Sequence, residues 1–169
     1  MRSRLEGERG TMLIETVIAS GVLMVTMLGL LSLGAVATLY TENEGHLAAR
    51  TTEYAQDKME QLLALAYTDA GSNTAVFPAA TSGGTGLAAG GSTNTAAPVD
   101  GYVDWLAYDG SLLGGGTTAP STWFYKRVWQ ITTPSSGMKQ ITVVTTVRSS
   151  VGRALIPKST VVALKASQI

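Results

Sequence analysis

The N-terminal part of the chain joins a short polar segment to a long apolar one. Residues 1–10 are polar and charged and end in Gly10, whereas the 26 residues from Thr16 to Thr41 contain neither a charged side chain nor a proline. Because an α-helix rises about 1.5 Å per residue, a helix of this length exceeds the roughly 30 Å hydrocarbon core of a bilayer. The pattern predicts a leader over residues 1–10 and a membrane-spanning helix over residues 11–41.

The helical pattern continues after Thr41, although the composition becomes polar. Apolar and small side chains recur every three or four residues, at Leu47, Thr51, Ala55, Met59, Leu62 and Ala66. Acidic side chains lie mostly off this stripe, which is typical of an amphipathic helix that packs on a folded domain. Asp69-Ala70-Gly71 is a helix stop signal. One helix is therefore expected from Thr11 to near Thr68, with residues 42–69 as its amphipathic continuation.

The middle of the chain, residues 70–122, is rich in Gly, Ala, Ser and Thr. Such a composition has little to bury and predicts a loop region. Inside it, Tyr102–Ala107 followed by Asp109-Gly110 has the pattern of a strand and a tight turn. The acidic residues here lack the alternating spacing of an EF-hand loop, so a strand is favoured over a calcium site.

The C-terminal segment, residues 123–169, contains three runs with the alternation of half-buried strands. The runs are Trp123–Thr132, Lys139–Arg148 and Lys158–Ala166. Short connections between them favour an antiparallel meander. The predicted fold class is α+β: a long N-terminal α-helix, membrane-spanning in its first half, packed on a C-terminal antiparallel β-sheet of three or four strands. Aromatic side chains are expected in the core or at the edge of this sheet, namely Trp123, Tyr125 and Trp129.

The net charge of zero, from 12 basic and 12 acidic residues, conceals a polarised chain. Residues 42–110 carry a net charge of −7, and residues 111–169 carry +7 with no acidic residue. Three interpretations of the basic sheet stay open. The cations are solvated and protect the sheet edges, or they complement the acidic region within or between subunits, or they bind DNA or another anion. Candidates for the last are Lys139, Arg148, Arg153 and Lys158.

The composition excludes several kinds of site. The chain has no cysteine and a single histidine, His46, which rules out a disulfide framework, a zinc finger and a thiol nucleophile. His46 has no evident nucleophile as a partner, and no nucleotide-binding loop or metal-binding motif occurs. We therefore expect a protein that is not an enzyme and uses no cofactor or metal.

Glu15 is the charged residue of the predicted membrane segment. An ionised carboxylate at the centre of a membrane helix costs about 2.5–3.5 kcal/mol. In one interpretation, Glu15 lies at the level of the lipid headgroups, or it caps the first helical turn, where its negative charge interacts favourably with the helix dipole. In the other, the chain is cut after Gly10, and the new α-ammonium of Thr11 in a neighbouring copy pairs with the Glu15 carboxylate.

A short basic leader, a glycine, and an apolar helix with a glutamate at its fifth position together resemble the class III signal of type IV prepilins and pseudopilins. The residues that carry the resemblance are Gly10-Thr11-Met12-Leu13-Ile14-Glu15. The family usually has Phe where this chain has Thr11. A shorter similarity, Met59-Glu60 followed by Leu62, is to minor pilins of the PilV type.

This resemblance implies a processing and assembly pathway. A prepilin peptidase would cut between Gly10 and Thr11 and N-methylate Thr11, and Glu15 would guide subunit assembly. The implied partners are other pilins or pseudopilins, the prepilin peptidase, an inner-membrane assembly platform and membrane lipid. The chain would lie in the inner membrane before assembly and then in an extracytoplasmic filament, in the periplasm or at the cell surface.

The expected function is therefore that of a structural subunit, and a minor one, of a type IV pilus, a competence pilus or a type II secretion pseudopilus. Two alternatives stay open. One is an unassembled, single-pass membrane-anchored binding module, which would keep its leader and tolerate Glu15→Ala. The other is a minor pilin that binds DNA through its basic sheet.

Overall fold

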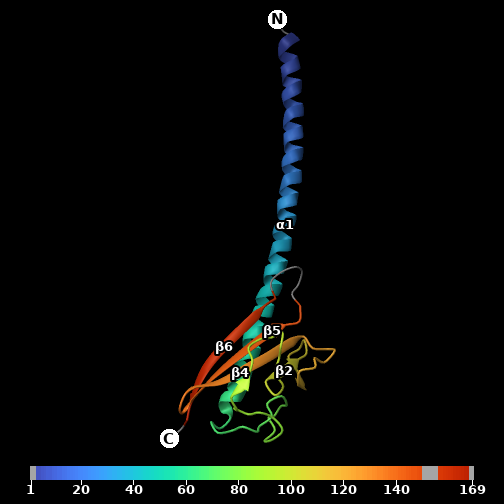
Figure 1. Ribbon diagram of the computed structural model, residues 1–169. Coiled ribbons are helices and arrows are strands. Elements are labelled where there is room, and N and C mark those ends of the chain that lie inside the picture. Colours follow the sequence, from blue (N-terminus) through green and yellow to red (C-terminus); the bar gives the residue numbers. More distant parts are fainter. Residues whose placement is uncertain (1–2, 150–155, 168–169) are drawn as a thin grey trace. The chain divides into compact units, whose positions relative to one another are not determined.

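The computed structural model describes residues 3–149 and 156–167, with side chains from residue 12 onward. The chain divides into two compact units, Met1–Glu42 and Asn43–Ile169. Helix α1 (Ser3–Ala64) belongs to both units, and all strands belong to the second (Figure 1). We call the second unit the head.

The described side chains of the first unit are all exposed, because α1 is there a single helix with nothing packed on it. Its apolar side chains retain about half or more of their accessible surface, for example 71% at Leu31 and 49% at Val36. Its serine and threonine hydroxyls donate to backbone carbonyls three or four residues earlier, as Ser32 does to Leu28 at 2.8 Å. These hydroxyls are therefore satisfied inside the helix, as a lipid environment requires.

The head is built on an antiparallel sheet, so the α+β fold class is confirmed. In chain order, the first four strands are β1 (Gly90–Gly91), β2 (Val103–Leu106), β3 (Leu112–Gly115) and β4 (Tyr125–Ser135). The remaining two are β5 (Met138–Val147) and β6 (Lys158–Ala166). The order of the strands in the sheet is β3-β2-β4-β5-β6. Strand β1 also pairs with β4, next to the position at which β2 begins its pairing with β4. The sheet has six strands, so the prediction of three or four was wrong.

The two strands that were not predicted, β1 and β3, are glycine-rich and lack any apolar alternation. Gly91 shows why glycine is required. Its φ is +79°, and a Cβ atom there would lie 2.2 Å from the Trp129 carbonyl oxygen of β4. A side chain would prevent this pairing, so the residues that make β1 possible also remove the pattern by which strands are predicted.

The predicted strand and turn at residues 102–110 are present as β2 and a hydrogen-bonded turn into β3. The predicted meander is present as β4, β5 and β6. The first of the three predicted runs ends at Thr132, but β4 extends through Pro134 to Ser135. Proline is tolerated there because the β4–β5 ladder is irregular between Thr132 and Ser135. The chain reverses at Gly137, whose φ is +77°.

The second half of α1 packs on one face of the sheet (Figure 1). The main core joins Ala55, Met59 and Leu62 of α1 to Trp129, Ile131, Ile141 and Val143 of β4 and β5. A second cluster on this face contains Leu47, Tyr54, Leu106, Tyr125 and Val147. The opposite face has its own cluster of Val103, Trp105, Val128 and Val144, with Trp123 packed against it. Trp129 and Tyr125 are thus core residues, and Trp123 is half-buried at the second face.

Helix α1 ends at Ala64, four residues before the expected end near Thr68. The last carbonyls of a helix need hydrogen-bond donors from outside it. Here Lys165 of the sheet supplies one, because it donates to the carbonyl of Leu63, and Lys139 donates to the carbonyl of Tyr67, three residues beyond the helix. The helix therefore ends where the sheet can satisfy its carbonyls.

Candidate functional site

The predicted processing residues Gly10 and Thr11 lie within α1, which begins at Ser3 and not at Thr11 as expected. The leader contains no proline, and its charged residues are compatible with helix. The helix therefore extends through the predicted cleavage position. The side chain of Thr11 is outside the described residues.

Glu15 is exposed on α1 among apolar neighbours. It borders a shallow hollow together with Ile14, Ile18 and Ala19. No other charged residue occurs until Glu42, almost eight helical turns later. The helix around Glu15 is long and apolar enough to span a membrane, so in such a setting this carboxylate has no cationic partner on its own helix between residues 16 and 41.

The described members of the predicted anion-binding set, Lys139, Arg148 and Lys158, differ in exposure and in the groups that they bind. Lys139 is half-buried, and its ammonium donates to the carbonyls of Tyr67 and Leu87, each at 2.7 Å. Arg148 is exposed and donates to the carbonyl of Ser121 at 2.9 Å. Lys158 is exposed at the start of β6, and Arg153 is outside the described residues. Two of the four candidates thus already bind backbone oxygen atoms of the chain.

Three charged side chains lie buried between α1 and the sheet: Lys58, Asp104 and Arg127. We call them the buried triad. Arg127 holds the Asp104 carboxylate with two hydrogen bonds, from Nε to Oδ1 at 2.7 Å and from Nη2 to Oδ2 at 2.8 Å. The Lys58 ammonium lies 2.8 Å from the same Oδ2. The side chains of Lys58 and Asp104 have no exposed surface, and that of Arg127 has 4%.

The rest of the surroundings of Lys58 are also well defined. Its ammonium donates to the Thr74 carbonyl at 2.7 Å and lies 4.1 Å from the centre of the Trp129 ring. The ring face carries the negative part of the aromatic quadrupole and so favours a cation. Lys58 therefore links α1, the segment after α1, β2 and β4.

The triad contains two cations and one anion, which shifts the pKa values of its members. Burial lowers the pKa of Lys58 to about 8, against the partly compensating attraction of Asp104. For Asp104, burial by itself raises the pKa, but the charges of Lys58 and Arg127 outweigh it and hold the pKa below its ordinary value. The carboxylate is thus ionised at neutral pH.

The triad was missed from the sequence, although a signal existed. Lys58 lies between Ala55 and Leu62 at helical spacing, on the apolar stripe itself. A charged residue on a buried stripe requires a charged partner. Asp104, inside a predicted strand, met that requirement. Arg127 of the basic sheet thus pairs with Asp104 of the acidic region in the same subunit. For this residue, the second of the three interpretations of the basic sheet holds.

The arrangement offers a membrane-type helix with one carboxylate and a head with a rigid charged core. Among the described residues, no three histidine or acidic side chains lie close enough together to hold a metal ion. Comparisons with protein-family models, curated proteins and solved structures find no match to this chain.

Proposed function

We propose that this chain is a minor structural subunit of a pilin-like filament, cut after Gly10 and assembled through the first half of α1. The observation that carries the proposal is the combination in one helix of Gly10, a carboxylate at the fifth following position and a 26-residue uncharged segment. The filament would belong to a type IV pilus, a competence pilus or a type II secretion pseudopilus.

The exposure of the first unit supports assembly. A contiguous set of exposed Leu, Val, Ile and Met side chains on a single helix is unstable in water and needs a lipid or protein environment. A bilayer supplies the first, and the helices of neighbouring subunits supply the second. In a bundle of such helices, Glu15 and the α-ammonium of Thr11 in a neighbouring copy would neutralise each other.

The architecture of the head supports a structural role. Its core contains a sheet and the second half of α1, joined by apolar clusters and by the buried triad. The sheet is thereby held on the second half of α1, which continues the chain of the first half. A force applied to the helix is then transmitted to the head by packing and by charge-assisted hydrogen bonds.

The experiment is to compare filament incorporation of the wild type and Glu15→Ala in cells that carry a type IV filament machine. Both proteins should insert in the inner membrane, and the variant should be depleted at least tenfold from sheared filaments. Glu44→Ala, which removes a partly exposed carboxylate from the head, is the matched control and should be incorporated normally. Equal incorporation of Glu15→Ala would contradict the proposal and favour the unassembled membrane-anchored module.

The alternative of a DNA-binding minor pilin is the weaker candidate. Lys139 is engaged with two backbone carbonyls and Arg127 with Asp104, so neither offers a free ammonium or guanidinium to a phosphate. The alternative predicts DNA binding that weakens steeply with salt and falls when Arg148 and Lys158 are changed together to Gln.

A further inference from the structure

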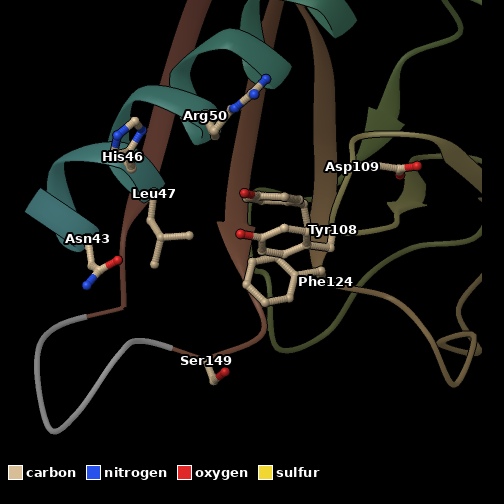
Figure 2. Close-up of a pocket in the computed structure, with 9 residues that line it drawn as sticks. Asn43, His46, Leu47, Arg50, Tyr108, Asp109, Phe124 and Ser149 are labelled. Carbon is tan, nitrogen blue, oxygen red and sulfur yellow. The ribbon is translucent and has the colours of Figure 1, made fainter.

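The head contains an open cavity of about 500 Å³ that neither assembly nor the buried triad uses (Figure 2). Helix α1 forms one side through residues of a single face, spaced three or four apart: Asn43, His46, Leu47 and Arg50. Aromatic residues form the other side: Tyr108, Phe124 and Tyr125. Asp109 and Ser149 complete the lining. Its volume lies in the roughly 300–1,000 Å³ range of small-molecule sites.

The aromatic side is a ladder of rings that begins in the core. Tyr54 packs edge-to-face on Tyr125 with ring centres 4.8 Å apart, and Tyr125 packs on Phe124 at 4.9 Å. Phe124 packs on Tyr108 at 5.0 Å. Exposure rises from 2% at Tyr125 to 73% at Tyr108. The ladder ends in a ring that is held on one side and open to solvent on the other.

The turn that carries Tyr108 is fixed in place. Asp109 Oδ1 accepts hydrogen bonds from the backbone amide and the hydroxyl of Ser111, at 3.0 and 2.7 Å. The backbone of Gly110 lies against the Tyr54 hydroxyl, so closely that a Cβ atom would come within 2.4 Å of it. Tyr108 is therefore presented by a pre-organised turn, which lowers the entropic cost of binding a ligand on its ring.

The cavity also offers polar groups that the chain leaves unused. Tyr125 lines the cavity although it is almost fully buried, and none of the described residues hydrogen-bonds to its hydroxyl. The opposite side presents the ring of His46, for which no described residue supplies a hydrogen bond.

The charges of the cavity nearly cancel. Arg50 is paired with Glu53 at 3.2 Å, and Asp109 contributes a carboxylate to the lining. A strongly anionic or cationic ligand would therefore gain little. The cavity instead suits a neutral molecule with a flat face of C–H groups and several hydroxyls. Such C–H groups pack on the negative face of an aromatic ring, and the hydroxyls both donate to and accept from Tyr, Asp, Asn and Arg side chains.

We propose that this cavity binds a neutral carbohydrate, with one sugar ring stacked on Tyr108 and its hydroxyls bonded to Tyr125, His46 and Asp109. The sugar could come from a polysaccharide of a bacterial surface or from a glycoconjugate of another cell, since both present the same rings. The proposal is independent of filament assembly, because every lining residue belongs to the head.

The test uses the full-length chain in a detergent without a sugar headgroup, applied to an array that carries neutral and acidic glycans of both sources. The neutral glycan with the strongest signal is then titrated by calorimetry. Tyr108→Ala should raise its dissociation constant at least tenfold. Tyr125→Phe, which keeps the ring and removes only the hydroxyl, should raise it about 2- to 10-fold, as expected for one neutral hydrogen bond.

The matched control is Phe77→Ala, which removes an equally exposed ring (79%) that does not line the cavity. It should leave the dissociation constant within twofold of the wild-type value. The proposal is overturned if no neutral glycan binds, if only acidic glycans bind and lose affinity in salt, or if binding survives Tyr108→Ala. Which spots of the array respond distinguishes a bacterial polysaccharide from a glycoconjugate of another cell.

Discussion

The two halves of α1 have the same helical backbone conformation, but their side chains suit different surroundings. Between residues 12 and 43 every described side chain is exposed, and the composition alone predicts a membrane or filament environment. Between Leu47 and Leu62, every third or fourth side chain is buried, in contact with a sheet of the same chain. The first half therefore depends on other molecules for its stability, whereas the second half depends on the head.

The two halves also treat charge differently. Glu15, in the first half, has no cationic partner in the apolar segment that follows it. Lys58, in the second half, is buried more deeply but has Asp104, the Thr74 carbonyl and the Trp129 ring around it. Lys58 thus has its anionic partner in the same subunit. By this comparison, the partner of Glu15 should come from another one.

The largest expected effect is from breaking the buried triad at its anion. Asp104→Ala would leave the buried cations Lys58 and Arg127 facing each other without a counter-charge. We expect the free energy of unfolding of the head to fall by about 3–5 kcal/mol. The measurement is denaturant unfolding of the full-length protein in micelles, followed by the fluorescence of its three tryptophans, all of which lie in the head.

Lys58→Met is the control for that variant. It removes one of the two cations, so the remaining pair has no net charge. Asp104 keeps both of its hydrogen bonds from Arg127. The methionine fills the space of the lysine stem against Trp129. Its cost should be less than half that of Asp104→Ala. Equal costs would show that the triad acts by packing and not by charge balance.

The next effect compares one leucine from each half of α1. Leu62 is completely buried, so Leu62→Ala should destabilise the head by about 2–5 kcal/mol. Leu28 is 55% exposed, and Leu28→Ala should leave unfolding of the head unchanged within about 0.5 kcal/mol. The same tryptophan-detected titration checks both. A similar loss from Leu28→Ala would mean that the two halves are not independent.

A charge in the first half should act on insertion and not on folding of the head. Leu28→Arg places a guanidinium near the middle of the uncharged segment, at a cost of about 2.5–3.5 kcal/mol. The fraction of protein that inserts into inner-membrane vesicles should fall sharply. Leu28→Phe keeps the segment apolar and should insert like the wild type. Normal insertion of Leu28→Arg would argue against a membrane-spanning role.

The smallest effect concerns acid stability. Because the pKa of Asp104 is lower in the folded protein than its ordinary value of 3.8, its ion pairs stabilise the head fully above that value. This contribution is lost as the pH falls through the lowered pKa, by at most about 1.4 kcal/mol per pH unit. Unfolding titrations of the wild type below pH 4 should therefore show a slope that Asp104→Asn reduces. An unchanged slope in the variant would assign the acid sensitivity to other carboxylates.

The parts of the structure that sequence patterns predict are those with strong periodicity. The stripe from Leu47 to Leu62 and the strands β4, β5 and β6 have it, whereas the segment before Thr41 is predicted by its uninterrupted apolar composition and β2 by the turn that follows it. The glycine strands β1 and β3 do not, because close approach of backbones selects against side chains. At the end of α1, the carbonyl of Leu63 is bound by Lys165, which is distant in sequence, so no local signal marks Ala64.

The functional features divide in the same way. Gly10 and Glu15 are recognised by their spacing along one helix, which the sequence shows directly. The buried triad assembles residues from α1, β2 and β4, and the aromatic cavity assembles residues from α1, the β2–β3 turn and the start of β4. Lys58 on an apolar stripe was a usable signal for the first. For the cavity, only the position of Tyr108 in a turn hinted at an exposed aromatic side chain.

The most direct test of the central claim is the N-terminal residue of the mature protein. The full-length chain is expressed in the membrane with and without a prepilin peptidase, and its N-terminus is determined by mass spectrometry. We predict that the protein begins at Thr11 with the peptidase and retains residues 1–10 without it. Gly10→Val should retain these residues in both cases. A wild-type protein that still begins with residues 1–10 in the presence of an active peptidase would contradict the pilin-like assignment.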